Sequence, residues 1–310
     1  MDFSIVIPVF NEEESLRELV ANIKRAFGKI KKTYEIIFVD DGSSDRTLEI
    51  LKLLARENRN VKIFSFRKNL GKSPALMLGF AKSSGKFIVT MDADLQDDPA
   101  NISGLHQKLV RGSFDLVTGW RKNRKDNIFK KISSSLFNSI VSALFEKKLH
   151  DLNSGLKIYR AELARELKIY GGMHRFIPVI ADELGYTIAE REIVHRARKY
   201  GISKYKFSKI LTDIPDLITI YFIMKYNRRP LHFFGKIGSS IFLIGIALLT
   251  YLSILHFQGE RIGDRPLLIF GVLLVIAGIQ TIFAGLIADL IVNFHAKDNE
   301  EYPIKFELNK

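Results

Sequence analysis

The chain has 310 residues, of which 47% are hydrophobic, which is enough for one or two domains with buried cores. It contains no cysteine, which excludes disulfide frameworks and thiolate metal sites and fits a reducing compartment. The formal net charge of +13 is typical of proteins that bind nucleic acids, anionic membranes or phosphorylated small molecules. The first residues, MDFSIVIPVF, have neither the basic region nor the cleavage site of a signal peptide, so none is expected.

The first 120 residues alternate between short β-rich runs and segments with helical spacing of apolar residues. This alternation predicts an α/β domain with a mostly parallel sheet and helices on both faces. Strands are predicted at 3–10, 34–41, 61–66, 86–94 and 114–120, and helices at 12–27, 43–57, 71–84 and 99–112.

The middle of the chain contains further elements of both kinds. An amphipathic helix is predicted over 126–148, a strand over 156–160 and a helix over 161–170. Residues 207–226 mix aromatic and aliphatic side chains with scattered charges, which resembles a helix lying in a membrane interface. An ordinary surface helix is the alternative for this last segment.

Two long apolar segments follow, at 234–257 and 266–294. The first has no charged residue after Lys236, and the second has a single late acid, Asp289. Each covers the roughly 20 residues that a bilayer core requires. A pair of buried helices is the alternative, but a helix that is apolar all round at this length is better suited to lipid. A helical hairpin that crosses the membrane is therefore predicted.

The charges beside the hairpin predict its orientation. Lys225, Arg228 and Arg229 precede it, whereas the connecting loop, QGERIGDRP, balances two arginines with two acids. The positive-inside rule then places both ends of the chain in the cytoplasm. The predicted parts are a cytoplasmic catalytic domain at 1–205, an interfacial juxtamembrane helix at 206–232, a transmembrane hairpin at 233–295 and a cytoplasmic tail at 296–310.

Polar residues collect where the predicted strands end. The four relevant stretches are PVFNEEE, VDDGSSD, MDADLQDD and TGWRKNRKD. The carboxyl ends of parallel strands meet at one edge of a sheet, where α/β proteins bind their ligands. Polar strand ends are common in general, but four together, two with paired aspartates, favour a binding site.

The densest acidic cluster lies in MDADLQDDP. Asp92 and Asp94 are two residues apart, so in an extended segment both carboxylates face one small volume. Their repulsion is costly unless a cation lies beside them, and hard oxygen ligands suit Mg²⁺ or Mn²⁺. Gln96 offers a further oxygen. Because Mg²⁺ completes its shell with substrate phosphates, a metal-diphosphate site is predicted. No Walker loop or Gly-X-Gly-X-X-Gly motif is present.

Taken together, the motifs resemble the polyisoprenyl-phosphate glycosyltransferases of glycosyltransferase family 2, which include dolichol-phosphate mannose synthases and bactoprenol glucosyltransferases. The resemblance covers residues 3 to about 205. The motifs that carry it are SIVIPVFNEEESL, EIIFVDDGSSDRTLEIL, NLGKSPALMLGF, MDADLQDDP, GWRKNRKD, DLNSGLKIYR, HRFIPV and RKYGISKY. It implies a GT-A fold, a nucleotide-sugar donor and a divalent metal.

The resemblance also implies roles for individual residues, which fall into three groups. The nucleobase would lie against Pro8, Phe10, Glu12, Val39 and Asp41, although Phe10 stands where a tyrosine is frequent. Asp92 and Ala93 would lie along the ribose and diphosphate, and Asp94 and Gln96, with Asp92, would ligate the metal. Arg121, Arg198 and Lys204 would contact the phosphates.

The implied reaction is direct displacement with inversion, in which a polyprenyl phosphate (undecaprenyl or dolichyl) attacks the nucleotide sugar. The acceptor is already anionic, so a strong general base is not required. Asp151 is the candidate acidic group on the sugar or acceptor side, with a loop cap as its alternative. Some relatives carry an aspartate where this chain has Leu156, so the identity of any base is open. His174 and Arg175 contact the acceptor or have structural roles.

Several alternatives stay open. UDP-glucose is the favoured donor, with GDP-mannose and a dolichol-phosphate mannose synthase as the alternative. A processive polysaccharide synthase would show a QXXRW motif and further spans, a non-catalytic sugar sensor would show a degraded acidic motif, and a nucleic-acid binder would need a reading module. The expected partners are the donor, the lipid acceptor and the bilayer. Oligomeric state is left open.

Overall fold

The computed structural model describes residues 1–122, 149–196, 199, 219, 221–222, 225–226 and 229–296. The chain divides into two compact units, 1–217 and 218–310. The predicted helix at 126–148, most of the predicted interfacial segment at 206–232, and the tail after residue 296 lie outside the described residues.

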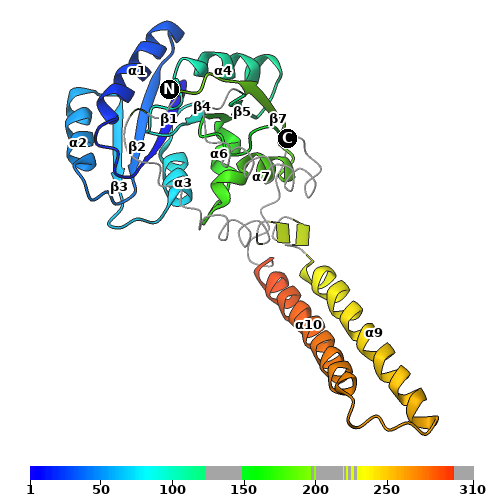
Figure 1. Cartoon of the computed structure of the whole chain (residues 1–310). Coiled ribbons are helices and arrows are strands. Elements are labelled where there is room, and N and C mark those ends of the chain that lie inside the picture. The colour runs from blue at the N-terminus through cyan, green and yellow to red at the C-terminus, as the bar shows by residue number, and fades with distance from the viewer. Residues whose placement is uncertain are drawn as a thin grey trace. The chain divides into compact units, whose positions relative to one another are not determined.

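The first unit contains a seven-stranded sheet in the order β3-β2-β1-β4-β6-β5-β7 (Figure 1). All paired strands are parallel except β6, which runs antiparallel between β4 and β5. The mostly parallel sheet predicted from the sequence is therefore confirmed. The strands are β1 (Phe3–Val9), β2 (Tyr34–Asp40), β3 (Val61–Ser65), β4 (Phe87–Thr90), β5 (Leu116–Trp120), β6 (Lys157–Arg160) and β7 (Ile188–Glu192).

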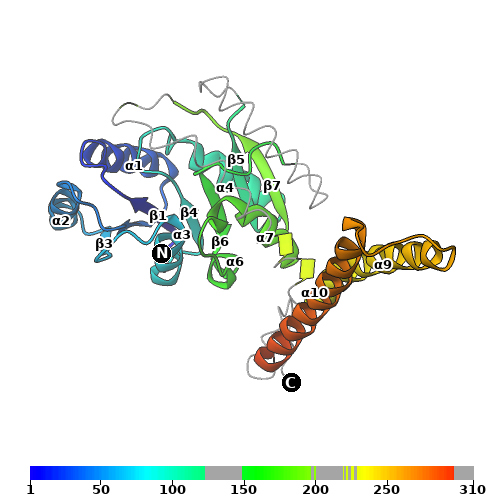
Figure 2. The same cartoon turned by 60° about the horizontal axis from the view of Figure 1, so that its bottom comes forward.

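Helices cover both faces of this sheet, as Figures 1 and 2 show. One face carries helices whose apolar residues join the largest buried cluster, and the other carries the helices that follow β3 and β6. The first group is α1 (Leu16–Ile30), α2 (Thr47–Glu57) and α4 (Asn101–Arg111). The second group is α3 (Lys72–Lys82), α6 (Ala161–Glu166), the 3₁₀ turn η1 (Met173–Phe176) and α7 (Ile177–Glu183).

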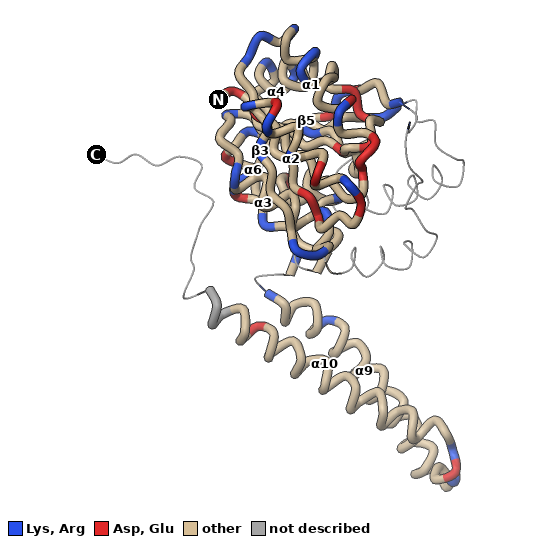
Figure 3. Tube along the Cα trace, turned by 90° about the vertical axis from the view of Figure 1, so that its left-hand side faces the viewer, with Lys and Arg blue, Asp and Glu red and all other residues tan. Residues whose placement is uncertain are grey.

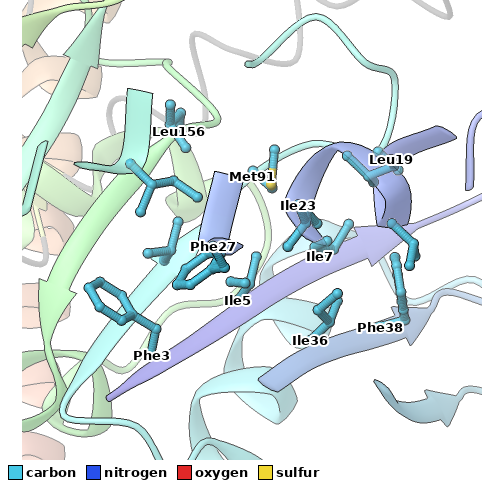
Figure 4. Packing of buried hydrophobic residues seen from close by; sticks show 14 of the residues in the cluster. Phe3, Ile5, Ile7, Leu19, Ile23, Phe27, Ile36, Phe38, Met91 and Leu156 are labelled. Carbon is cyan, nitrogen blue, oxygen red and sulfur yellow. The ribbon is translucent and has the colours of Figure 1, made fainter. Parts of the chain in front are cut away.

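The alternation of side chains along the strands assigns residues to the two faces. Ile5 and Ile7 of β1 belong to the cluster under α1, where Figure 4 shows them beside Ile23 and Phe27. The intervening Val6 points to the opposite face and meets Gly79 of α3 so closely that a Cβ there would lie 2.2 Å from Val6 Cγ1. Both faces of β1 are thus buried, as expected of a central parallel strand.

The registers bring the functional ends of the strands together. Val9 pairs with Asp40 at the end of β1 and β2, and Val6 pairs with Thr90 at the end of β4. Because β6 is antiparallel, its first residue, Lys157, pairs with that same Thr90. The carboxyl ends of the parallel strands and the amino end of β6 therefore share one edge of the sheet.

A buried acid stabilises β2 away from that edge. The Glu35 side chain is 1% exposed, accepts hydrogen bonds from Ser4 Oγ and Ser84 N, and lies 2.6 Å from Lys62 Nζ. Burial by itself would raise its pKa, but Lys62 and the serine donors lower the pKa of Glu35 to about 2. The folded protein therefore stabilises the ionised carboxylate of Glu35.

Glu35→Gln is expected to lower the free energy of unfolding by about 3 kcal/mol near neutral pH. Since the folded pKa lies below the ordinary 4.5, this stabilisation is complete above pH 4.5 and disappears as the pH falls towards 2. Urea unfolding of the full chain, followed through its single tryptophan, Trp120, measures the difference at pH 7 and pH 3. A difference that stays constant between these pH values would contradict the assignment.

The second unit contains two long apolar helices, α9 (Pro230–Phe257) and α10 (Pro266–Ala296), which pack side by side. Glycines at seven-residue spacing allow close approach, since a Cβ on Gly238 would lie 2.8 Å from the Gly278 carbonyl oxygen. Figure 3 shows that charged residues are rare along both helices and gather in the connecting loop. Both are long and apolar enough to cross a membrane, by length and composition.

Candidate active site

The loops after β1 and β2 are tied together at the sheet edge. Asn11 has a φ of 53° and donates its backbone N–H to Ser43 Oγ at 2.9 Å, while its side-chain oxygen accepts from the Ser44 N–H at 2.8 Å. The Glu12 N–H donates to Thr47 Oγ1 at 2.9 Å. These contacts fix the loop after β1, which contains the predicted nucleobase residues Phe10 and Glu12.

The other predicted nucleobase residues are more deeply placed. Asp41 accepts the backbone N–H groups of Leu70 at 2.7 Å and Gly71 at 2.9 Å, so it holds the loop that leads into α3. Gly71 has a φ of 97°, which favours glycine. Val39 is completely buried, so its side chain is not exposed for a direct contact with a base. Pro8 is half-buried at the same edge.

Asp92 follows β4 and pairs with a lysine that the sequence analysis did not single out. Lys72, in the first turn of α3, places its Nζ 2.5 Å from Asp92 Oδ1. Burial would raise the pKa of Asp92, but Lys72, with Arg121 and Lys157 nearby, holds that pKa below its ordinary value. Asp92 is therefore ionised and directed by a neighbouring cation.

The rest of the acidic cluster is compact. Leu95 adopts a φ of 62°, and the turn brings the Gln96 N–H to 3.2 Å from Asp94 Oδ1. Asp94 and Asp97 are buried, and Ala93 between Asp92 and Asp94 is 4% exposed. Burial, together with the charges of Asp92 and Asp94, raises the pKa of Asp97 to about 7. Asp97 therefore ionises less readily than an ordinary aspartate, because it is buried and its neighbours Asp92 and Asp94 are also acidic.

This donor set fits a divalent cation. Carboxylate and amide oxygens suit Mg²⁺ or Mn²⁺, and a cation would relieve the repulsion that acts on Asp97. Among the described residues, no three His, Cys, Asp or Glu side chains form a complete cage. The residues fit a metal that is held by one or two carboxylates and completes its shell with water and substrate oxygens.

The chain after β7 lies along the acidic loop. The Arg196 N–H donates to the Gln96 carbonyl oxygen at 2.8 Å, and His195 and Asp97 form an isolated antiparallel β-bridge through their backbones. Asn101 Nδ2 donates to the Val194 carbonyl oxygen at 3.1 Å. Residues 194–196 therefore lie beside the predicted metal ligands. Arg198 and Lys204 themselves lie outside the described residues.

A buried ion pair joins the ends of two further segments. Arg121, after β5, binds Asp151 through two nearly parallel bonds, Nε to Oδ2 at 2.6 Å and Nη2 to Oδ1 at 2.8 Å. The two side chains are 9% and 7% exposed. Asp151 also receives the Arg121 N–H, and its own N–H donates to Glu190. This geometry turns the Asp151 carboxylate towards Arg121.

A cavity lies directly beside Asp92. Lys72, Lys157, His174 and Tyr159 are among the residues that line it. Of the residues predicted from the resemblance, Pro8 and Asp92 line it. The sequence analysis missed Lys72 and Lys157, although both lie in quoted motifs, NLGKSPALMLGF and DLNSGLKIYR. The other lining residues are Leu76, Thr90, Met91, Asn153, Ser154, Gly155 and Ile177.

The protonation state and tautomer of His174 follow from its neighbours. Ser73 Oγ donates to the Gly171 carbonyl at 2.7 Å, so it accepts from His174 Nδ1 at 3.1 Å. Burial, and then the charge of Lys72, lowers the pKa of His174 to about 3. His174 is therefore neutral, and its Nε2 is an acceptor.

Gly155→Ala is expected to reduce turnover by about 100-fold while the protein still folds. A Cβ at Gly155 would lie 2.6 Å from Asp92 Oδ2 and 3.0 Å from Asp97 Oδ2, so the acidic cluster must move. Gly28→Ala, in α1, is the matched control because nothing lies within 4 Å of its Cβ position. Steady-state kinetics measures the turnover number of both variants. Equal turnover numbers in Gly155→Ala and Gly28→Ala would show that catalysis does not depend on the position of Asp92.

The fold is that of a GT-A-like α/β domain, and solved structures share it. Glucosyl-3-phosphoglycerate synthase from Mycobacterium tuberculosis, in complex with Mn²⁺, UDP-glucose and phosphoglyceric acid, matches with a TM-score of 0.56 at 20% identity. The match covers 72% of this chain and 79% of that one. The GT-A fold predicted from the resemblance is confirmed.

The sequence comparisons define the family. The family model "Glycosyl transferase family 2" matches residues 4–168, and the chain belongs to this family of glycosyltransferases. The dodecaprenyl-phosphate galacturonate synthase of Rhizobium johnstonii is 39% identical over 304 residues, which cover 96% of this chain and 90% of that protein. The undecaprenyl-phosphate 4-deoxy-4-formamido-L-arabinose transferase of Pectobacterium atrosepticum is 34% identical over 93% of this chain and 87% of that protein. The resemblance seen in the sequence is thereby confirmed.

Proposed function

We propose that the protein transfers a sugar from a nucleotide sugar to a polyprenyl phosphate and releases the nucleoside diphosphate. The observation that carries the proposal is the set of oxygen ligands that follows β4, namely the acids Asp92 and Asp94 and the amide of Gln96. The names of the two relatives, both of which act with polyprenyl phosphates, support the acceptor.

On the donor side, Asp94, Gln96 and Asp92 would hold a divalent metal. The metal supplies positive charge where the leaving diphosphate gains negative charge. Pro8, Phe10, Glu12 and Asp41 hold the base, with Val39 beside it, and Ala93 lies with Asp92 along the ribose and diphosphate. Mg²⁺ and Mn²⁺ both suit these oxygen ligands.

The remaining cations contact phosphate oxygens. Arg121 approaches a phosphate with the donors that its ion pair leaves unused, and Asp151 acts as a positioning residue that fixes the guanidinium plane. The resemblance assigns Arg198 and Lys204, which lie outside the described residues, to the diphosphate as well. The acceptor phosphate is ionised near neutral pH, so it attacks the anomeric carbon directly, with inversion and without a strong general base.

The second unit places the enzyme at the membrane. The hairpin of α9 and α10 crosses the bilayer, and the catalytic unit and the tail lie on the cytoplasmic side. Aromatic rings gather before and at the start of α9, with Phe222 and Phe233 centroids 5.3 Å apart and Tyr226 and Phe233 centroids 5.1 Å apart. Such rings are typical of the membrane–water interface.

The donor is a uridine nucleotide in this proposal. UDP-glucose was the expectation from the resemblance, but the sugars in the names of the two relatives are galacturonate and 4-deoxy-4-formamido-L-arabinose. GDP-mannose is the alternative. A processive synthase is disfavoured, because the relatives that match over nearly the whole chain are named for a lipid phosphate acceptor.

The proposal is tested by product analysis with the full chain in detergent, a metal ion and a short polyprenyl phosphate. UDP-glucose, UDP-galacturonate and GDP-mannose are compared, and the unphosphorylated polyprenol is the acceptor control. Metal-dependent formation of a polyprenyl-phospho-sugar from one donor is expected. Equal transfer to the polyprenol, or no lipid product from any donor, would overturn the proposed acceptor.

A further inference from the structure

Lys157 is a buried cation without a carboxylate partner. It is 4% exposed, and its Nζ donates to the Ser154 carbonyl oxygen. Within the described part of the chain, no carboxylate oxygen lies within ion-pair distance of this Nζ. An ammonium group has three donors, so Lys157 keeps donors for a ligand.

Lys157 lies where a ligand of the active site could reach it. Lys157 pairs with Thr90 at the end of β4, two residues before Asp92, and lines the same cavity as Asp92. A donor whose diphosphate lies at the acidic cluster would therefore have its sugar close to Lys157. The cavity is also lined by three apolar residues, Leu76, Met91 and Ile177.

The charges in the cavity can be balanced by one monovalent anion. Lys72 is neutralised by Asp92, and His174 is neutral, so Lys157 contributes the one uncompensated charge among the described lining residues. Burial, and then the charge of Lys72, lowers the pKa of Lys157 to about 7. A bound carboxylate would restore the fully charged ammonium, as an opposite charge does in general.

We propose that Lys157 binds a carboxylate carried by the transferred sugar, so that the donor is a nucleotide-linked uronic acid. This inference rests on the proposed function and specifies its substrate class. His174 accepts a hydrogen bond from a hydroxyl of the same sugar. The named product of the 39% identical relative, a galacturonate, is of this class.

The test compares donors that differ only at C6. UDP-galacturonate and UDP-galactose, and likewise UDP-glucuronate and UDP-glucose, exchange a carboxylate for a hydroxymethyl group. The full chain is assayed with polyprenyl phosphate as wild type, Lys157→Met and Lys157→Arg. Lys86→Met is the matched control, because Lys86 is exposed at the amino end of β4.

The wild type is expected to favour one uronate donor over its neutral partner by about 100-fold in kcat/KM, because a buried lysine would be left unpaired by the neutral sugar. Lys157→Met should reduce that ratio to a few-fold, and Lys157→Arg and Lys86→Met should largely keep it. A wild type that uses both donors of a pair equally well would overturn the inference, even if Lys157→Met does not fold. An equal loss with both donors in Lys157→Met would also overturn it and would indicate an acceptor or structural role. Absence of lipid product from every donor would instead count against the proposed function.

Discussion

Asp94→Asn is expected to reduce sugar transfer by at least about 1,000-fold, with unchanged folding. The substitution keeps the shape of the side chain and its acceptor for the Gln96 N–H but removes the charge that faces the metal and the diphosphate. Electrostatic stabilisation of the leaving group is usually the largest catalytic contribution, so we expect its loss to lower mainly kcat. Initial rates across metal concentrations measure the effect.

Asp45→Asn is a suitable control for this first prediction, because Asp45 is a carboxylate at the same edge of the sheet that serves a loop contact with Thr47. It should change transfer only slightly. Activity of Asp94→Asn within tenfold of the wild type, at any metal concentration, would remove Asp94 from the metal site.

Separating Arg121 from Asp151 is expected to have the second large effect. Asp151→Leu leaves the Arg121 guanidinium buried and unpaired, which costs about 3–5 kcal/mol of stability. In the double variant Arg121→Leu with Asp151→Leu, both charges are absent, so most of that stability should return. Transfer should stay at least about 100-fold below the wild type in both, because the phosphate contact is lost.

Thermal unfolding and kcat/KM of the two single variants and the double variant form a double-mutant cycle that separates folding from function. A double variant that recovers activity along with stability would show that the pair is purely structural. A stable and active Asp151→Leu variant would show that Arg121 does not need its partner.

The parallel part of the fold could be predicted from local pattern. Ile5, Ile7, Ile36 and Phe38 lie in short apolar runs bounded by helical periodicity, and such runs specify buried parallel strands with little help from distant residues. The position of Asp92 and Asp94 at the sheet edge follows directly from that prediction. The acidic half of the site was therefore readable in the sequence.

Two cations of the site, Lys72 and Lys157, could not be singled out from the sequence, for a physical reason. Lys157 reaches the edge only because β6 runs antiparallel and is inserted between β4 and β5, and strand order depends on long-range pairing. Lys72 meets Asp92 because Gly71 and Asp41 fix the start of α3. The bidentate contact of Asp151 with Arg121 was likewise not predicted, and the expected place of Asp151 near the sugar or acceptor stays a prediction.

Equilibrium binding to the full chain in detergent tests whether the acidic cluster binds a metal together with the nucleoside diphosphate. UDP and GDP are titrated calorimetrically in the presence of Mn²⁺ and then of a chelator, with the wild type and with Asp94→Asn. One nucleotide, with uridine favoured, is expected to bind only when both the metal and Asp94 are present. Equal affinity without metal, or unchanged affinity in Asp94→Asn, would show that the cluster is not a metal-diphosphate site.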